Sequence, residues 1–542
     1  MYTHPGVYIE HVPSGVLAIE AASTSVAAFI GHIPRGARVT ASAGEPVFIG
    51  NQSQYAQHFG PLPAPAGGIR NNGQTADAFG HAVSLFFANG GTKAYVVPVA
   101  SSNGTASTVS AVLEEGTVAL EATSGGTWAD GLLVRFIEEL GAVPADSIPR
   151  TYTVQIGRRV TNPDGTTKTE KAINTDGAEF DQAVIEPFET FTGIVLSAGH
   201  PRNIDSVING ASLILTATFS ATGGAATVLP ADSVLGSGAD TAAPGDTDYQ
   251  AAYDRLRDYR DISIMLLPGK VWDSSGQGAI QRAITHAEFM QNRMVIVDPV
   301  NPGSNATQLK TPVDVRDEGF PTSPYTALYY PYLKVTNPFY DEDTAANLPR
   351  TFAVPPSAMA AGMWARIDGS RGVWKAPAGL EATVRGSLGP NVLIGNAIQG
   401  NLNEWGVNCI RSIIGPPVIW GARTLATKSK PEFRYVPVRR TQSMIGESLY
   451  RALQAVVFEP NDHKLWSSLR ASVGNFMDQL HRAGAFQGEK ASDAYYVRCG
   501  LGSTMTQADI DSGIVRVVIG FAPLKPAEFV VVQIQQIVGQ SA

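Results

Sequence analysis

Charged and aromatic residues gather between Met359 and Gly379, which makes this stretch the first candidate for chemistry. An active-site interpretation would use Arg366 or Arg371 to clamp an anionic group, because a guanidinium donates several hydrogen bonds in a fixed fork. The alternative, which we favour, is a buried turn with an internal Arg–Asp ion pair and packed tryptophans. The charged residues of the stretch are Arg366, Asp368, Arg371 and Lys375, and its tryptophans are Trp364 and Trp374.

Sequence motifs for catalysis and metal binding are missing elsewhere. The nine histidines are scattered, and none forms H-x-x-x-H or H-E-x-x-H, so we predict no metal site. Neither a phosphate-binding G-x-x-x-x-G-K-[ST] loop nor a G-x-S-x-G nucleophile turn occurs. We therefore predict no catalytic residue and no cofactor, and a protein that is not an enzyme. The alternative left open is an α/β enzyme with a β-rich insertion and no recognisable catalytic motif.

Length and charge narrow the class of protein. A chain of 542 residues is too long for one hydrophobic core, so we expect several domains. Charged residues make up 16%, against about 25% in typical soluble proteins, which suits a chain that hides surface against partners. The sequence has no basic patch of the kind that binds nucleic acid. It also has no apolar run of 18 residues, which a membrane-spanning helix would need. Two distant cysteines, Cys409 and Cys499, predict neither a metal motif nor a disulfide framework.

The order of predicted elements indicates a mixed α/β core interrupted by a second domain. Residues 23–100 read as strands and an amphipathic helix, and a strand–helix alternation typical of a parallel sheet returns after residue 246. Between them, residues 101–245 are rich in Thr, Gly, Ala and Ser, carry 17 acidic and 7 basic side chains, and predict a β-sandwich or barrel. The clearest helix spans Asn461 to Gly484, with one wide apolar face.

Both ends of the chain contain strand-forming segments. Near the start, Val7 and Ile9 alternate with Tyr8 and Glu10 between Pro/Gly turns. Near the end, two Val/Ile-rich runs flank a proline-bounded break at Ala522 to Ala527. An apolar terminal strand exposes unpaired backbone groups that template pairing with another chain. We therefore expect terminal arms that join neighbouring copies by strand addition.

Several long blocks, in the same order along the chain, resemble the contractile tail sheath proteins of phages and phage-like injection particles. They cover roughly residues 1–100 and 250–542, whereas residues 101–245 match no family that we recognise. The blocks are Pro5 to Glu10, Val12 to Gly15, Ser23 to Gly31, Phe86 to Gly91, Ala94 to Val97, Val354 to Ser357, Arg371 to Ala378, Trp420 to Leu425, Phe433 to Arg440, Val456 to Asp462, Met505 to Gly513 and Pro526 to Val530.

The resemblance implies a structural subunit that stacks as hexameric rings, or strands of a six-start helix, around a rigid inner tube. Contraction would rotate and spread the subunits while the arms keep them connected, and would drive the tube through the target cell envelope. The implied partners are further copies of the chain, the tube protein, and baseplate and tail terminator proteins at the ends. The implied location is the tail of a virion or an equivalent particle, assembled in the bacterial host cytoplasm.

Combining the resemblance with the residue patterns gives five parts and a set of candidate contact residues. The parts are an N-terminal arm (1–22), an α/β core (23–100 and 246–380), a β-rich outer insertion domain (101–245), a C-terminal sheath domain (381–527) and a C-terminal arm (528–542). The inter-subunit arm strands are assigned to Val7, Tyr8, Ile9, Glu10, Phe529, Val530, Val531, Val532, Gln533 and Ile534. A helix facing the tube is assigned to Lys464, Arg470 and Arg482, although a core helix with a solvated face explains the same pattern. A third class, a secreted surface-layer or adhesion protein, is disfavoured because the first 20 residues lack the pattern of a signal peptide.

Overall fold

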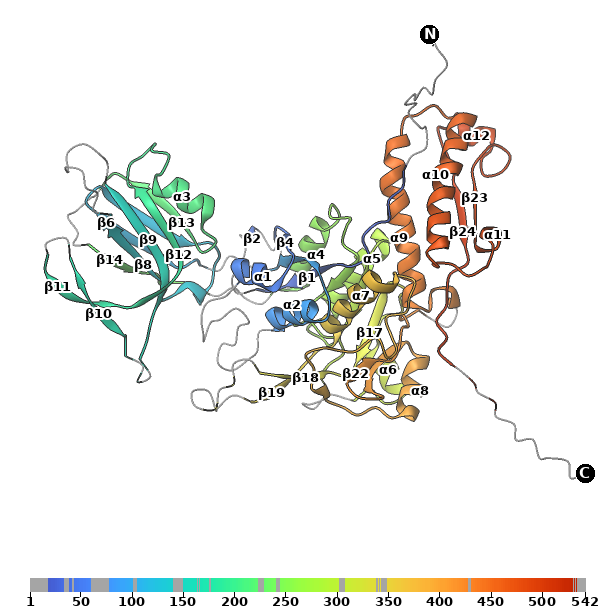
Figure 1. Cartoon of the computed structure of the whole chain (residues 1–542), viewed down its shortest axis with the longest axis horizontal. Helices are drawn as coiled ribbons and strands as arrows, with labels where there is room; N and C mark the ends of the chain where they lie inside the picture. The colour runs from blue at the N-terminus through green and yellow to red at the C-terminus, as the bar shows by residue number, and fades with distance from the viewer. Residues whose placement is uncertain are drawn as a thin grey trace, which may run out of the picture.

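The molecule is elongated, with the β-rich insertion at one end, an α/β sheet in the middle and a helical domain at the other end (Figure 1). The structure is a computed structural model, and none of the helices it describes is long and apolar enough to cross a membrane. It describes residues 18–33, 39–40, 43–59, 78–100, 105–139, 150–162, 164, 166–174, 177–222, 229–239, 244–301, 308–337, 340, 342, 349–426, 430–529, 531 and 533.

The central sheet has eight strands, six of them parallel, as the strand–helix alternation predicts. Its outermost strands are antiparallel to their neighbours. Two of its strands come from residues 407–419, beyond residue 380, where we expected the core to end. In spatial order the strands are β22 (Pro417–Ile419), β21 (Val407–Ser412), β17 (Thr326–Tyr330), β16 (Met294–Val297), β15 (Ile264–Leu266), β1 (Val26–Gly31), β5 (Lys93–Pro98) and β4 (Val47–Ile49).

Helices cover both faces of this sheet, and the strand residues alternate between them. Ala27 and Phe29 of β1 pack into one apolar cluster, whereas Val26, Ala28 and Ile30 pack into the other. Burial on both faces explains why these strands are continuous apolar runs. The first face carries α1 (Gln52–Phe59), α2 (Ala78–Ala88) and α7 (Ser357–Arg371), and the second carries α4 (Asp246–Arg255), α5 (Gln277–Met290), α6 (Pro312–Glu318) and α8 (Asn396–Glu404).

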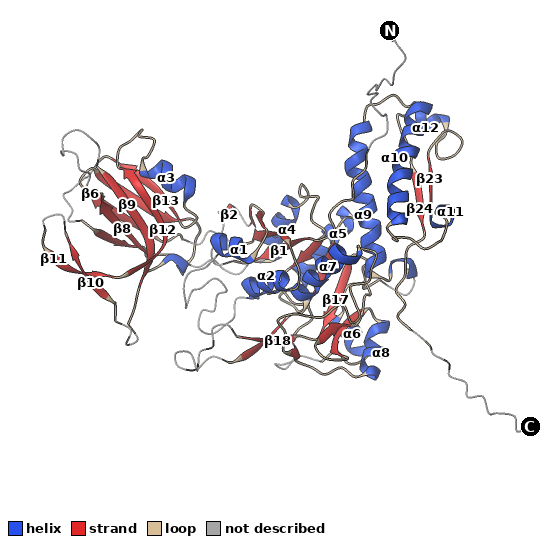
Figure 2. Ribbon diagram, in the orientation of Figure 1, coloured by secondary structure: helices blue, strands red, loops and turns tan. Residues whose placement is uncertain are grey.

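The insertion is a sandwich of two antiparallel sheets around one apolar cluster. The first sheet has the order β12-β9-β8-β14, the second has the order β13-β7-β6, and a separate hairpin joins β10 to β11. Figure 2 shows this strand-rich unit apart from the helices of the core. Its elements are β6 (Thr108–Leu113), β7 (Gly116–Ala122), β8 (Leu133–Glu138), β9 (Thr151–Arg159), β10 (Thr169–Ile173), β11 (Glu179–Ala183), β12 (Ile185–Val195), α3 (Ile204–Ala211), β13 (Leu215–Ser220) and β14 (Ala231–Val234).

The remaining elements form small sheets and the C-terminal helical domain. Strands β18 (Leu333–Thr336), β19 (Thr351–Val354) and β20 (Gly389–Pro390) make one small sheet, and β2 (Val39–Thr40) pairs with β3 (Ala43–Gly44). The helical domain contains α9 (Val436–Leu453), α10 (His463–Arg482), α11 (Ala491–Ala494), β23 (Tyr495–Arg498), α12 (Gln507–Asp511) and β24 (Val518–Phe521). This domain carries most of the features that bear on assembly.

Candidate assembly interface

Helices α9 and α10 build the helical domain by sharing one apolar cluster. Met444, Ile445 and Leu449 of α9 pack with Val473 and Phe476 of α10. The Asp462 carboxylate caps α10 by accepting a hydrogen bond of 2.9 Å from the backbone N–H of Leu465. The two helices therefore form a firm base for the short strands beside them.

Those strands make a two-stranded antiparallel sheet, β23–β24. Tyr495, Val497, Ile519 and Phe521 are partly buried against the α9–α10 cluster, whereas Tyr496 is 49% exposed on the other side. An isolated pair of strands is marginally stable in water. Because neither outer edge is paired with another described strand, the sheet can accept strands from elsewhere.

The segment that follows the predicted N-terminal arm lies against the same body. Ile19 is part of the α9–α10 cluster, and the Ala22 N–H donates a hydrogen bond of 2.8 Å to Ser448 Oγ on α9. Thr24 accepts from Arg440 through its carbonyl and donates to Asp368 through its hydroxyl. The four N-terminal arm residues assigned from the sequence, Val7 to Glu10, lie outside the described residues.

The C-terminal segment is held by a charge pair that sequence reasoning missed. The Arg423 guanidinium pairs with the Glu528 carboxylate, and their side chains are only 7% and 15% exposed. Arg423 also donates to the Asn403 carbonyl at 2.7 Å, and the Tyr435 hydroxyl donates to Glu528 at 3.3 Å. Arg423 and Glu528 both lie in sequence blocks that resemble the sheath family. Their place in these blocks was the one signal in the sequence that pointed to them.

Beyond this clasp, two of the described arm residues are largely exposed to solvent. Phe529 and Val531 are 77% and 80% exposed. Phe529, Val531 and Gln533 belong to no strand of this chain. Val530, Val532 and Ile534 lie outside the described residues. The assignment of this segment as an inter-subunit strand stays a prediction, since only a neighbouring copy could pair with it.

The three cations assigned to a tube-facing helix do lie on α10, but they have different surroundings. Lys464 is exposed. Arg470 donates to the Cys499 carbonyl and, at 3.0 Å, to Ser467, so part of its role is structural. Arg482 is 79% exposed and pairs at 2.5 Å with Asp478, one helical turn away. Lys464 and Arg482 lie on the exposed side of α10, opposite its buried apolar side.

The charged residues between Met359 and Gly379 make separate polar contacts, although Arg371, Trp374 and Lys375 line one groove, and most of the stretch does not form a turn. Met359 to Arg371 belong to α7, whose residues are buried on nearly all sides. Arg366 donates to the Thr383 carbonyl at 2.7 Å, Arg371 pairs with Glu381 at 2.7 Å, and Lys375 donates to the adjacent Ala376 carbonyl at 3.1 Å. The expected internal Arg–Asp pair is also wrong, because Asp368 pairs with Arg440 of α9.

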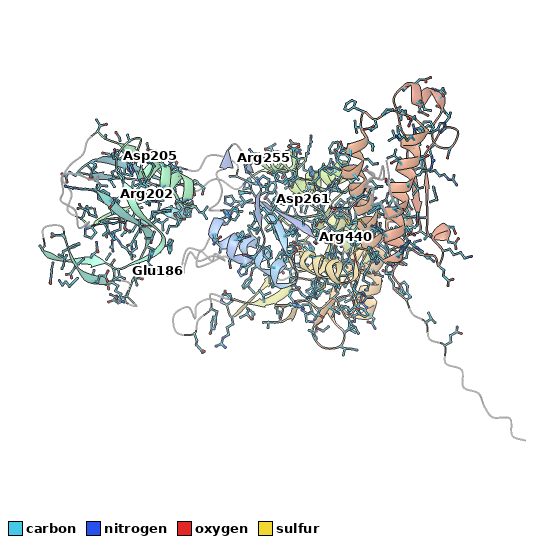
Figure 3. The ribbon with its side chains drawn as sticks, turned by 45° about the horizontal axis from the view of Figure 1, so that its top comes forward. Glu186, Arg202, Asp205, Arg255, Asp261 and Arg440 are labelled. Atoms are coloured by element: carbon cyan, nitrogen blue, oxygen red, sulfur yellow. The ribbon has the colours of Figure 1, made fainter. Side chains whose placement is uncertain are left out.

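The Asp368–Arg440 pair instead joins the core to the helical domain. The side chains are 5% and 3% exposed, and the Arg440 guanidinium stacks 4.5 Å above the Trp364 ring. Burial raises the pKa of the Asp368 carboxyl, while Arg440 opposes that rise. Figure 3 shows Arg440 where the C-terminal helices meet the core. This geometry is that of a structural joint.

The carboxyl ends of the parallel strands are where an α/β enzyme would bind its substrate. The strongly perturbed acid there is Asp298, directly after β16. Its carboxylate accepts hydrogen bonds from the N–H and hydroxyl of Ser357 at 3.1 and 2.5 Å, at the start of α7. Burial raises the pKa of Asp298 to about 7, although both hydrogen bonds oppose the rise. Asp298 is thus sealed beneath α7 and presents no reactive group to a substrate.

This raised pKa predicts a pH dependence of stability. Because folded Asp298 binds its proton more tightly than the unfolded residue, with its ordinary value of 3.8, stability falls as the pH rises from about 4 to about 7. Asp298→Asn lacks this loss, so its free energy of unfolding should exceed that of the natural chain by up to about 4 kcal/mol at pH 8. Denaturation at pH 4 and pH 8 measures the difference, with the exposed Asp317→Asn as control. A difference that does not change with pH would contradict the assignment.

Comparison with known proteins supports the sheath resemblance. A family model described as the phage tail sheath C-terminal domain matches residues 428–537, which include α9, α10 and the β23–β24 sheet. The tail sheath protein of Burkholderia phage BcepMu is 35% identical over 170 residues, or 30% of this chain. That alignment spans about a third, 34%, of the phage protein.

Solved structures show the same fold over nearly the whole chain. The helical sheath of the anti-feeding prophage in its contracted state is 22% identical, with a TM-score of 0.56 over 99% of this chain and 100% of that one. The sheath tail protein of Listeria innocua is 12% identical, with a TM-score of 0.55 over 93% and 96% of the two chains. Residues 428–537 therefore match the phage tail sheath C-terminal domain, and the chain as a whole shares the fold of these solved sheath proteins.

Proposed function

We propose that the protein is a structural subunit of a contractile sheath in a phage tail or a phage-like injection particle. Copies would stack as hexameric rings, or strands of a six-start helix, around an inner tube, with baseplate and terminator proteins at the ends. Contraction would drive the tube through the envelope of a target cell. This work needs no catalytic residue and no cofactor, because the extended lattice can store the free energy that contraction releases.

The observation that carries the proposal is the unfinished β23–β24 sheet, together with the anchored segments at the two ends of the described chain. Ile19, two residues into the described chain, packs into the cluster that supports this sheet, and Glu528 is clasped just before the exposed Phe529. Segments anchored so close to an open sheet are well placed to reach the corresponding sheet of a neighbour. A repeated head-to-tail contact of this kind generates a helical filament.

The position of the insertion also suits the proposal. The acidic residues 101–245 form a separate sandwich at the far end of the molecule from α10 (Figure 1). If the helical domain faces the tube, the insertion lies on the outside of the sheath. It can then vary in sequence without disturbing the inner mesh.

Negative-stain electron microscopy of the purified chain, alone and with its tube partner, tests the proposal. Long hollow tubes with a six-fold helical lattice are the expected result. Discrete globular particles in the presence of the tube partner would contradict it, and would favour the enzyme alternative.

The proposal that α10 faces the tube gives a separate prediction. Lys464→Glu combined with Arg482→Glu should weaken co-assembly with the tube by about tenfold, because two exposed cations become anions. Arg470 is left intact since it supports the Cys499 carbonyl. Sedimentation of sheath with preformed tubes measures the change, and Lys168→Glu in the insertion serves as the matched control. Unchanged co-assembly would exclude this side of α10 from the tube interface.

A further inference from the structure

Phe458 is an exposed aromatic side chain in an unfavourable backbone conformation. It is 102% exposed, its φ is +74°, and the neighbouring Val457 is 55% exposed. A positive φ is disfavoured for a residue with a Cβ atom, most of all for a bulky one. The isolated chain gains nothing from holding an apolar side chain in this way.

The loop that carries Phe458 is nevertheless held firmly between α9 and α10. The backbone N–H of Val457 donates to the Gln454 carbonyl at 3.3 Å, and that of Glu459 donates to the Val456 carbonyl at 3.2 Å. Below them, Asn461 accepts a hydrogen bond of 2.8 Å from the Trp466 indole. Phe458 and its neighbour Val457 therefore form a fixed apolar knob, with the exposed Glu459 beside it.

A groove of about 850 Å³ opens at the opposite end of α10. Its wall includes Ala483 and Gly484, which follow α10 directly, and two tryptophans, Trp374 and Trp420. Trp420 is 36% exposed. An aromatic side chain can pack against indole rings, which makes the groove a suitable receptor for the knob.

The groove is cationic overall, because Arg371 and three further cations line it and its carboxylate, Glu528, is paired with Arg423. Lys375, Arg411 and Lys525 line the groove, and none of them has a carboxylate within 4 Å among the described residues. Arg411 Nε is buried, and the described part of the chain provides no hydrogen-bond partner for it. The carboxylate of Glu459, next to Phe458, is the complementary charge.

The positions of the knob and the groove exclude a contact within one chain. Phe458 precedes the start of α10, the groove follows its end, and a helix of 20 residues is about 30 Å long. Two different surfaces at opposite ends of one element give a head-to-tail contact, which continues from copy to copy.

We propose that the Phe458 knob of one subunit inserts into the Trp374–Trp420 groove of a neighbouring subunit, with Glu459 meeting its cationic rim. This inference rests on the proposed function, since it adds a second contact to the sheath lattice. The contact differs from strand exchange because it is made by side chains at the ends of α10.

Cross-linking tests the contact directly. The native Cys409 and Cys499 are both buried, so few cross-links should form through them. Cross-links through new surface cysteines can therefore be detected clearly. A chain carrying Phe458→Cys and Trp420→Cys should form a ladder of covalent oligomers when assembled tubes are oxidised, whereas each single variant should not. The matched control pairs Trp420→Cys with Phe289→Cys, since Phe289 is 69% exposed on α5.

Polymerisation gives the second readout. Phe458→Ala should raise the critical concentration for tube formation by about tenfold to a hundredfold, as expected for the lost burial of one phenylalanine, and Phe289→Ala should leave it unchanged. Phe458→Gly removes the unfavourable φ, so it should weaken polymerisation while leaving the monomer at least as stable. The Phe458→Gly variant therefore distinguishes loss of the contact between subunits from a defect in folding of the monomer.

The possible outcomes distinguish the contact from the function on which it rests. Normal tubes without a ladder, and with unchanged polymerisation of Phe458→Ala, would overturn the contact and leave the sheath function standing. A ladder formed between Trp420→Cys and Val7→Cys, in place of Phe458→Cys, would assign the groove to the N-terminal arm of a neighbour and also overturn the contact. A natural chain that never polymerises with its tube partner would overturn the proposed function itself.

Discussion

Replacing Asp368 with alanine is expected to lower the free energy of unfolding of the core by about 3–5 kcal/mol. The substitution leaves the Arg440 guanidinium buried against the Trp364 ring, with the Thr24 carbonyl as its remaining hydrogen-bond acceptor. An uncompensated buried charge costs far more than the pair itself contributes. Hydrogen exchange of α7 and α9 with increasing denaturant is the suitable measurement, because a chain of several domains need not unfold in one step.

A double variant supplies the control. Asp368→Leu with Arg440→Met replaces both charges by apolar side chains of similar size, and should cost much less than Asp368→Ala alone. If the single and double variants lose equal stability, the packing of α7 on α9 determines the effect and the charge does not.

A second buried charge cluster strengthens the same joint. Glu447 of α9, whose side chain is 4% exposed, accepts from Arg260 at 2.7 Å and from Arg451 at 2.8 Å. Asn292 donates to it at 3.0 Å. Burial raises the pKa of Glu447, but these hydrogen bonds and the nearby guanidinium outweigh burial and lower it overall. Two separated ionic contacts, Asp368–Arg440 and Arg260–Glu447, therefore join α9 to the core.

Much of the core was predictable because its elements carry local signals. The apolar runs of β1, β5 and β16 and the one-sided apolar face of α10 are visible in the sequence and appear as expected. They follow directly from burial on two faces of a sheet and on one side of a helix.

Helix α7 was misread because that local signal is missing. It is buried on nearly all sides, so its apolar residues show no one-sided period. Gly362 lowers the helix propensity of this segment, and a Cβ there would lie 2.4 Å from the Phe86 carbonyl oxygen. The glycine is present because α2 and α7 approach each other closely, and this cause is invisible in the sequence.

The charge pairs were not predictable, because they depend on the complete fold. Asp368 and Arg440 are 72 positions apart, and Arg423 and Glu528 are 105 apart. Composition and spacing do not select such partners among 40 basic and 48 acidic residues. The resemblance to the sheath family marked the sequence blocks that contain three of these residues, Arg440, Arg423 and Glu528, without pairing them.

Deleting residues 1–13 is expected to abolish ordered contractile tubes. The deleted segment contains Val7 and Ile9, which we expect to add a strand to the β23–β24 sheet of a neighbour, and burial of each would contribute about 1.5–3 kcal/mol to every contact. Because a lattice repeats this contact in every subunit, the deletion weakens the connection between all neighbouring subunits of the tube. Electron microscopy with the tube partner, before and after a trigger of contraction, measures the result.

The truncation should leave the subunit folded, which makes the experiment specific. The contacts of Ile19, Ala22 and Thr24 with α7 and α9 all lie after the cut. A finer pair of variants in the intact chain separates sequence from length: Val7→Asn with Ile9→Asn should weaken assembly, whereas Glu10→Gln on the opposite side of the strand should not. Ordered contractile tubes from the truncated chain would show that the arm is dispensable, and the connection between subunits would then have to come from side-chain contacts such as the Phe458 knob.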